Sequence, residues 1–261
     1  MKYRGSLKVI AVYAGDRRQW ADKNGAEESC KIVECWAHLL KTINYGSGMD
    51  VLFVNNEVDN KEDEGYKSFV LKLNSLINKK IKTGGKIMVE HRPNTGLMMG
   101  SYNYAFQKYK NDYDYFWFTE DDRFNVVEGS LTNGIEKIEK SKNTDNAVGF
   151  VCTQALITKL RGCRGCCGIV SSEILKEIFN EKGTHSEFVM ETSSSYRGAE
   201  RSEYRLTRAM GHYNYKLDHL DNEYGISIIW KNKGGYPYWD KYRKGWVAKI
   251  LKYCETCVDD E

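Results

Sequence analysis

The sequence predicts an α/β protein with a mostly parallel central sheet flanked by helices. Two observations support this fold class. Four short apolar runs, each suited to a buried strand, alternate with helical patterns along residues 7–125. Such alternation implies parallel strands with covering helices, a Rossmann-like open sheet. Each apolar run also ends in polar residues, and ligands of such sheets bind beyond the carboxyl ends of the strands.

Each expected element of the first half follows from its own pattern. The strands are apolar runs bounded by turn residues, such as the Gly15-Asp16 pair after the first run. The helix at 25–43 has acidic residues in its first turn, where they suit the helix dipole, and apolar residues at helical spacing. We therefore expect strands at 7–16, 49–56, 86–94 and 113–122, separated by helices at 25–43, 66–81 and 95–110.

The pattern loosens after residue 125, although helical and strand segments still alternate. Ser171 or Ser172 is a suitable cap for the amphipathic segment that follows them. We see neither an internal repeat nor a linker, so we expect one domain over residues 1–261. The expected elements are helices at 127–141, 171–182 and 200–212, one or two strands within 146–160, and a strand at 213–220.

The composition and net charge of the chain limit the kinds of partner that it could bind. The 261 residues are 41% hydrophobic and 13% aromatic, which is enough apolar material for a core. The net charge of +3, from 39 basic and 36 acidic side chains, argues against a nucleic-acid partner, which would need a concentrated basic face. The basic clusters at 78–86 and 241–252 suit a solvated surface, with a phosphate groove or peripheral contact with an anionic membrane as the alternatives.

The expected location is cytoplasmic. The amino-terminal stretch has no apolar segment of the length that a signal peptide needs, and no run of about 18 apolar residues predicts a transmembrane helix. The 8 cysteines are then expected to be mostly reduced. A structural zinc site is the alternative to free thiols, because two Cys-x-x-Cys pairs could together supply its four ligands. These pairs are Cys163 with Cys166, and Cys254 with Cys257.

Three adjacent acids, Glu120, Asp121 and Asp122, end the fourth predicted strand. Neighbouring carboxylates repel one another, but a divalent cation can neutralise them. Mg²⁺ and Mn²⁺ prefer oxygen ligands, and they usually share one or two carboxylates with substrate phosphates. The position of the acids after a buried strand favours such a metal site over the alternative, a solvated acidic turn.

Residues 92–122 resemble the central signature of GT-A fold glycosyltransferases, particularly those of the family 2 type. That signature is Arg-x-Asn-x-Gly, then a helix with Gly-x-x-x-Asn-x-Ala, then an acidic metal motif after an apolar strand. The resemblance covers about residues 7–125 well and the remainder more loosely. The matching residues are Arg92, Asn94, Gly96, Gly100, Asn103, Ala105, Glu120, Asp121 and Asp122.

This resemblance implies a nucleotide-sugar donor, either a UDP- or a GDP-sugar, and a bound Mn²⁺ or Mg²⁺. Asp122 is then the main metal ligand. Glu120 would contact the metal or the ribose, with Asp121 as the alternative for the ribose, because glutamate is longer than the usual aspartate. Residues 1–125 would bind the donor and residues 126–261 the acceptor. The implied substrate-binding residues, besides these acids, are Asp16, Asn55, Asn56, Arg92, Asn94, Gly96 and Asn103.

The resemblance also implies a carboxylate base that takes the proton of an acceptor hydroxyl, on a glycan or another acceptor, with inversion at the sugar. Glu200 is the first candidate and Glu203 the second, because Arg201 stands where the family often has an aspartate. His219 would complete the metal shell; weaker candidates are His185, His212 and Asp221.

Two other interpretations remain open from the residues alone. One is a nucleotidyltransferase on a related sheet, and the other is a non-catalytic protein that binds a nucleotide sugar. The resemblance to the family also implies that the small-residue stretch 161–175 forms a loop that shapes the acceptor pocket, where its glycines would let the backbone approach a sugar closely. The aromatic stretch 232–246 suits either sugar stacking or coverage of the core.

Overall fold

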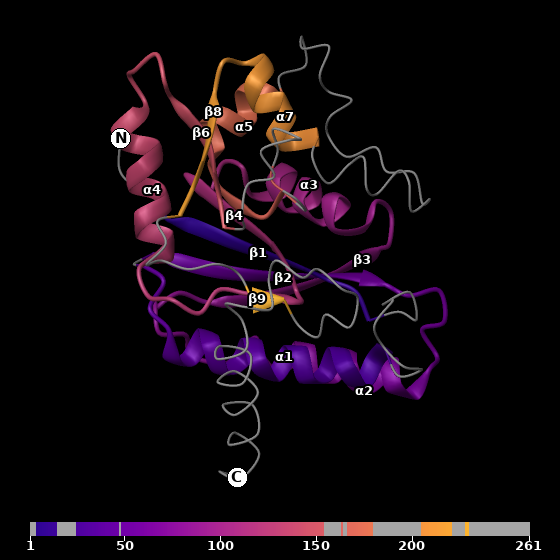
Figure 1. The fold of residues 1–261 in the computed structure, drawn as a ribbon. Coiled ribbons are helices and arrows are strands. Elements are labelled where there is room, and N and C mark those ends of the chain that lie inside the picture. The colour runs from indigo at the N-terminus through magenta and orange to yellow at the C-terminus, as the bar shows by residue number, and fades with distance from the viewer. Residues whose placement is uncertain are drawn as a thin grey trace, which may run out of the picture.

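The structure is a computed structural model that describes residues 4–14, 25–46, 48–153, 163, 166–179, 205–220 and 228–229. In this part of the chain, seven strands form one sheet in the order β3-β2-β1-β4-β7-β6-β8 (Figure 1). These strands are β1 (Ser6–Val12), β2 (Met49–Glu57), β3 (Ile87–Pro93), β4 (Tyr115–Glu120), β6 (Val148–Cys152), β7 (Gly168–Ser171) and β8 (Lys216–His219). Two short strands, β5 (Arg123–Phe124) and β9 (Ile228–Ile229), pair separately.

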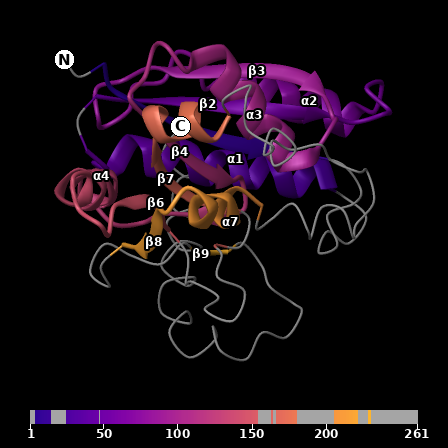
Figure 2. The same ribbon diagram turned by 90° about the horizontal axis from the view of Figure 1, so that it is seen from above.

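The predicted fold class, a mostly parallel α/β sheet, is confirmed. Strand β1 pairs in parallel with both β2 and β4, and β2 pairs in parallel with β3. Strand β7 runs antiparallel to its neighbours β4 and β6, whereas β6 and β8 are parallel to each other. Figure 2 shows this succession from β3 on one side of the molecule to β8 on the other.

Helices cover both faces of the sheet (Figure 1). Helices α1 (Gly25–Thr42) and α2 (Glu64–Asn74) lie side by side on one face. Helices α3 (Leu97–Tyr109) and α5 (Ser172–Ile178) lie on the other, where the rings of Phe106 and Phe179 meet at 4.9 Å. Helix α4 (Ser130–Ser141) packs against β6 and β7, and α7 (Arg205–His212) against β6 and β8.

Two expectations about the elements are wrong. The helix expected at 66–81 ends at Asn74, where Ser75 caps it and turns follow. The stretch 161–175, expected as a loop of the acceptor pocket, contains the sheet strand β7, whereas the helix expected from residue 171 does begin there, as α5 with Ser171 as its cap. Gly168 is required there by packing, because a Cβ atom at this position would clash with the ring of Phe150 and the carbonyl oxygen of Val151.

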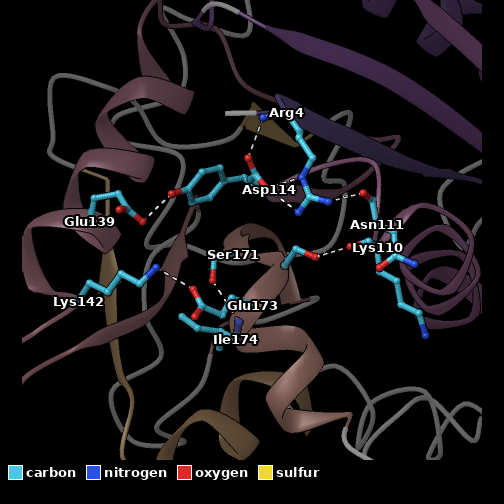
Figure 3. Close-up of polar contacts among 11 residues, drawn as sticks. Arg4, Lys110, Asn111, Asp114, Glu139, Lys142, Ser171, Glu173 and Ile174 are labelled. Carbon is cyan, nitrogen blue, oxygen red and sulfur yellow. Dashed lines mark hydrogen bonds and ion pairs between the residues drawn. The ribbon is translucent and has the colours of Figure 1, made fainter. Parts of the chain in front are cut away.

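Long-range polar contacts join several elements at the amino-terminal edge of the sheet (Figure 3). The backbone nitrogen and Nε of Arg4 donate to the carboxylate of Asp114 at 2.7 and 2.9 Å. Lys142, after α4, pairs with Glu173 of α5 at 2.7 Å, and Ser171 caps α5 by accepting from the backbone nitrogen of Ile174. These contacts stabilise the edge opposite to the polar strand ends.

Candidate active site at the carboxyl edge of the sheet

The polar strand ends lie at one edge of the sheet, as the sequence predicts. In the register of the strands, Asn55 of β2 stands beside Val12 of β1, and Arg92 of β3 stands beside Asn56. On the other side of β1, Glu120 stands beside Ala11. The ends of β3, β2, β1 and β4 therefore bring these side chains to one edge. Asp16, at the end of the first predicted strand, lies outside the described residues.

Asn56 fixes the side chain of Arg92. The fully buried Asn56 amide donates to the carbonyl oxygen of Val12 at 3.1 Å and to Ser101 Oγ at 2.8 Å, and its Oδ1 accepts from Arg92 Nη1 at 2.6 Å. Arg92 Nη2 donates to the carbonyl oxygen and the hydroxyl of Thr95, both at 2.7 Å. Arg92 is thus held in one orientation between β2 and the start of α3.

The two glycines of the signature shape the same turn. Gly96 precedes α3 with φ of +95°, a left-handed conformation that favours glycine. A Cβ atom on Gly100 would clash with the carbonyl oxygen of Thr95 and come within 2.9 Å of Arg92 Nη1. The signature residues Arg92, Gly96 and Gly100 therefore act together in building the β3–α3 turn, and Asn94 within it has a buried Oδ1 without a hydrogen-bond partner.

A second network surrounds Asn55. Its amide nitrogen lies 2.9 Å from Tyr66 Oη and 3.1 Å from His91 Nδ1, and His91 Nε2 contacts Asn74 Oδ1 at 3.0 Å. Within the part of the chain that the structure describes, the buried Oδ1 of Asn55 has no hydrogen-bond partner. Burial lowers the pKa of His91, which favours a neutral imidazole. Asn55 therefore presents an acceptor atom that a polar ligand could satisfy.

Two pockets, each of about 620 Å³, flank these networks. One lies along α3 beside Arg92 and includes Asn103, Tyr104, Gln107 and Lys108. Behind it, Glu90 accepts hydrogen bonds from both Tyr104 and Tyr109 and pairs with Lys108 at 2.8 Å. The other pocket, on the α2 side, is lined by Glu57, Lys61, Tyr66, Lys67, Val70, Leu71, Asn74 and His91.

The three acids of the turn after β4 have different surroundings. Asp121 points inward and is only 6% exposed. Its backbone nitrogen donates to the carbonyl oxygen of Ala11 at 3.0 Å, and its own carbonyl accepts from Trp36 Nε1 at 2.7 Å. Its carboxylate accepts from the backbone nitrogen of Tyr13 at 3.4 Å. Asp121 thus joins the ends of β1 and β4.

Arg123 is the partner of the other two acids. Arg123 Nε donates to Glu120 Oε2 and lies 4.0 Å from Asp122 Oδ1, too far for a hydrogen bond. Burial acts to lower the pKa of Arg123, but the charges of Glu120 and Asp122 outweigh it, so the pKa is raised and the guanidinium stays charged. Part of the negative charge that the sequence assigned to a metal is therefore neutralised by the chain itself.

The residues present fit a metal held mainly by one carboxylate. Asp122 Oδ1 is buried and has no hydrogen-bond partner among the described residues, which suits an oxygen ligand of Mg²⁺ or Mn²⁺. Glu120 is occupied by Arg123, and His219, with a side chain 58% exposed, lies 3.6 Å from Asp218. Within the described residues, no group of three His, Cys, Asp or Glu side chains is arranged to hold a metal.

Only some of the remaining residues singled out in the sequence lie in the part of the chain that the structure describes. Glu200, Glu203, His185 and Asp221 lie outside the described residues, as do Cys254 and Cys257. Cys163 and Cys166 are fully buried free thiols, and Cys163 Sγ donates to the carbonyl oxygen of Cys167 at 3.2 Å. Cys35 on α1 is disulfide-bonded, which is an exception to the expectation that the cysteines are mostly reduced; the other five described cysteines are free thiols.

Sequence reasoning missed two buried cations near the acidic turn. Arg123 follows the three acids directly, and a basic residue in this position could have predicted an ion pair within the turn. Lys8, fully buried in β1, donates to Asn125 Oδ1 at 3.2 Å, and its Nζ lies 3.1 Å from the ring centroid of Trp117. Nothing in the apolar run around Lys8 indicates this aromatic environment, because its partners come from distant segments.

No helix in the described part of the chain has the length and apolar character needed to cross a bilayer.

Comparison with known proteins bears on the fold alone. The sequence matches no protein-family profile and no curated protein. Among solved structures, the mannosyltransferase PcManGT from Pyrobaculum calidifontis, in complex with GDP-Man and Mn²⁺, has a TM-score of 0.50 at 13% identity, over 100% of this chain and 66% of that one.

Two further structures are less similar. A cytidylyltransferase from Leptospira borgpetersenii has a TM-score of 0.46 at 11% identity, over 98% of this chain and 95% of that one. The glycosyltransferase GlyE of Streptococcus pneumoniae has a TM-score of 0.43 at 10% identity, over 98% of this chain and 51% of that one. This chain therefore spans about two thirds of PcManGT and half of GlyE. Its sheet order and its likeness to PcManGT establish a GT-A-like fold.

Proposed function

We propose that this protein is a metal-dependent glycosyltransferase that moves a sugar from a UDP- or GDP-sugar to a hydroxyl group of a glycan or another acceptor. The observation that carries the proposal is the carboxyl edge of the sheet. There Asn55, Arg92 and the acidic turn converge, and Asp122 Oδ1 and Asn55 Oδ1 are both buried acceptors without a partner. In open α/β sheets of this kind, ligands bind outside the carboxyl ends of the strands, which is where these residues lie.

Asp122 is the residue that would hold Mn²⁺ or Mg²⁺, with the donor phosphates supplying further oxygen ligands. The ion, when bound, neutralises charge on the leaving diphosphate. Asn55 would accept a hydrogen bond from the nucleoside base. Arg92, fixed by Asn56 and Thr95, would present its remaining N–H groups to the base or the diphosphate.

The base of the reaction is proposed from the sequence. Glu200, or in its place Glu203, would take the proton of the acceptor hydroxyl as that oxygen attacks the anomeric carbon. A carboxylate base and direct attack give inversion at the sugar. Glu200→Gln and Glu203→Gln should therefore lower transfer to an acceptor strongly, while each leaves the affinity for the nucleoside diphosphate near that of the wild type.

The test is donor turnover. The wild type is incubated with Mn²⁺ and a panel of UDP- and GDP-sugars, and the released nucleoside diphosphate is measured. We expect release from one donor and its loss in Asp122→Asn. Asp112→Asn is the matched control, because Asp112 is an exposed acid near the amino-terminal end of β4.

Three results would contradict the proposal. One is no release from any donor, combined with no change in melting temperature on adding UDP or GDP with Mn²⁺. Another is equal release by the wild type and Asp122→Asn. A third is release of pyrophosphate from a nucleoside triphosphate, which would assign the site to nucleotidyl transfer instead.

A further inference from the structure

Arg123 is a buried cation that the donor site, as proposed above, leaves without a role. The residue is 8% exposed and stands at the start of β5, directly after the three acids. Its guanidinium has five N–H donors. Nε is bound to Glu120 Oε2, and the nearest oxygen of Asp122 lies 4.0 Å from the same nitrogen.

The terminal nitrogens of Arg123 are the informative atoms. Across the described residues, neither Nη1 nor Nη2 has a hydrogen-bond or ion-pair partner, although the side chain is only 9% exposed. Neither nitrogen is among the buried atoms without a partner in the described residues, so both keep some contact with solvent. A guanidinium that is fixed through Nε and has its terminal N–H groups open to solvent can donate to an external acceptor.

The chemistry of the guanidinium selects the acceptor. Its planar fork pairs with phosphate or carboxylate oxygens through two parallel hydrogen bonds. The carboxylate of Glu120 already occupies Nε, and Asp122 Oδ1 is held apart at 4.0 Å. A phosphate group can approach the unpaired nitrogens while the Glu120 contact stays in place, and the carboxyl edge is where phosphates bind in such sheets.

We propose that Arg123 binds a phosphate group of the nucleoside diphosphate directly, through Nη1 and Nη2, with Glu120 serving to hold the guanidinium in place. The identity of the ligand as a nucleoside diphosphate rests on the proposed function. The acidic turn then has two tasks. Asp122 offers an oxygen to a metal ion, and Arg123, held by Glu120, offers the phosphates its terminal N–H groups in a contact that does not depend on that ion.

In the transfer step, the bond between the anomeric carbon and the donor phosphate oxygen breaks, and its electron pair stays on that oxygen. The acceptor oxygen forms the new bond to the anomeric carbon, and its proton passes to the carboxylate base. Negative charge therefore grows on the departing diphosphate. A fixed guanidinium next to that charge stabilises the departing group without reorganising.

The test measures binding without metal. Affinities for UDP, GDP, UMP and GMP are measured by titration calorimetry in EDTA, for the wild type, Arg123→Met and Arg123→Lys. We expect the wild type to prefer the diphosphate of its nucleotide over the monophosphate, and Arg123→Met to lose about 10-fold to 100-fold of diphosphate affinity. Arg123→Lys should be intermediate, because a lysine keeps the charge but not the fork.

Two further variants keep the test decisive. Arg4→Met is the matched control, because Arg4 is an arginine paired with Asp114 at the opposite edge. Arg123→Met leaves Glu120 buried beside no cation, so Glu120→Gln/Arg123→Met, which removes both charges, replaces it if the single variant does not fold. A folded Arg123→Met or double variant that retains the wild-type preference for diphosphate would overturn the proposal, as would a wild type that shows no such preference.

This experiment separates the inference from the proposed function. If no sugar donor is turned over but diphosphate binding depends on Arg123, the transferase proposal fails and the phosphate contact stands. If a donor is turned over and Arg123→Met binds diphosphate like the wild type, the transferase proposal stands and the role of Arg123 is refuted.

Discussion

Asn56 Oδ1 accepts a hydrogen bond from Arg92 Nη1 at 2.6 Å, across the adjacent ends of β2 and β3. The same amide donates to Val12 and Ser101, so one buried side chain connects three strands and α3. This contact and the hydrogen bonds to Thr95 fix the orientation of the Arg92 side chain. The relationship explains why an asparagine stands at position 56, near the end of β2: its amide has both a donor and an acceptor for these partners.

Replacing Asn56 by leucine should destabilise the protein and weaken nucleotide binding together. The substitution keeps the volume but leaves Arg92 Nη1, the carbonyl oxygen of Val12 and the hydroxyl of Ser101 with one partner fewer. Each lost partner of a buried group typically costs about 1–3 kcal/mol. Urea denaturation measures the free energy of unfolding, with Asn78→Leu, at an exposed loop position, as the control. Equal stability of Asn56→Leu and wild type would refute the role of Asn56.

Gly100→Ala and Gly211→Ala should change stability in opposite directions. Both glycines lie in helices, but a Cβ atom on Gly100 would clash with the carbonyl oxygen of Thr95, whereas none of the atoms in the described structure lies within 4 Å of one on Gly211. We expect Gly100→Ala to cost about 1–3 kcal/mol by overpacking, and Gly211→Ala to gain up to about 1 kcal/mol of helix stability. Thermal denaturation measures the melting temperature of both variants. A higher melting temperature for Gly100→Ala than for the wild type would contradict the close packing of Gly100 against Thr95 and Arg92.

Lys8 should make stability rise with pH. Its Nζ is enclosed by the rings of Trp36, Tyr45 and Trp117 and donates to Asn125. Burial lowers the pKa of Lys8 well below its usual value, and the negative charge of a Cys167 thiolate would only partly oppose this. Between that lowered pKa and about 10.4, the unfolded chain binds a proton that the folded chain lacks, so raising the pH favours the folded state.

Lys8→Met should remove this pH dependence and raise the melting temperature at pH 7, because methionine fills similar space without a buried amine. Melting temperatures from pH 7 to pH 10 test this, with Lys79→Met, an exposed lysine, as the control. A wild type and a Lys8→Met variant whose melting temperatures change in parallel over this range would show that Lys8 does not titrate between the folded and unfolded states.

Breaking the pair of Glu120 and Arg123 from the acid side should also be harmful. Glu120→Gln leaves a guanidinium that is 9% exposed without its carboxylate, and removing one partner of a buried pair typically costs about 3–5 kcal/mol. The loss should be partly restored when UDP or GDP is added in EDTA, because a phosphate would then supply the missing charge. A melting temperature that UDP and GDP leave unchanged in Glu120→Gln would contradict that part of the account.

The strands and helices of the first half could be predicted from local pattern, because each apolar run is short and ends in turn residues. The strand β7 could not. Its four residues follow Cys166 and Cys167 in a glycine-rich stretch, and only pairing with β4 and β6 makes them a strand. Local sequence carries no signal of an antiparallel strand whose partners lie about 20 to 50 residues away.

The candidate site was predictable in its location but not in its charge balance. Parallel strands place their carboxyl ends together, so Asn55, Arg92 and the acids were expected at one edge. The pairing of Glu120 with Arg123 depends on the turn after β4, which points Asp121 inward and leaves Asp122 Oδ1 unpaired. Which of three adjacent carboxylates faces a ligand is decided by this backbone geometry and not by their order in the sequence.

The most direct test of the central claim is the effect of Mn²⁺ on nucleotide affinity, measured by titration calorimetry in the wild type and in Asp122→Asn. UDP and GDP are each titrated with Mn²⁺ and with EDTA. The account predicts that Mn²⁺ tightens binding of one nucleotide at least tenfold in the wild type, and that Asp122→Asn loses this gain while keeping its affinity in EDTA. An equal effect of Mn²⁺ in both proteins, or no effect in the wild type, would contradict the claim that Asp122 holds a metal ion with the nucleotide.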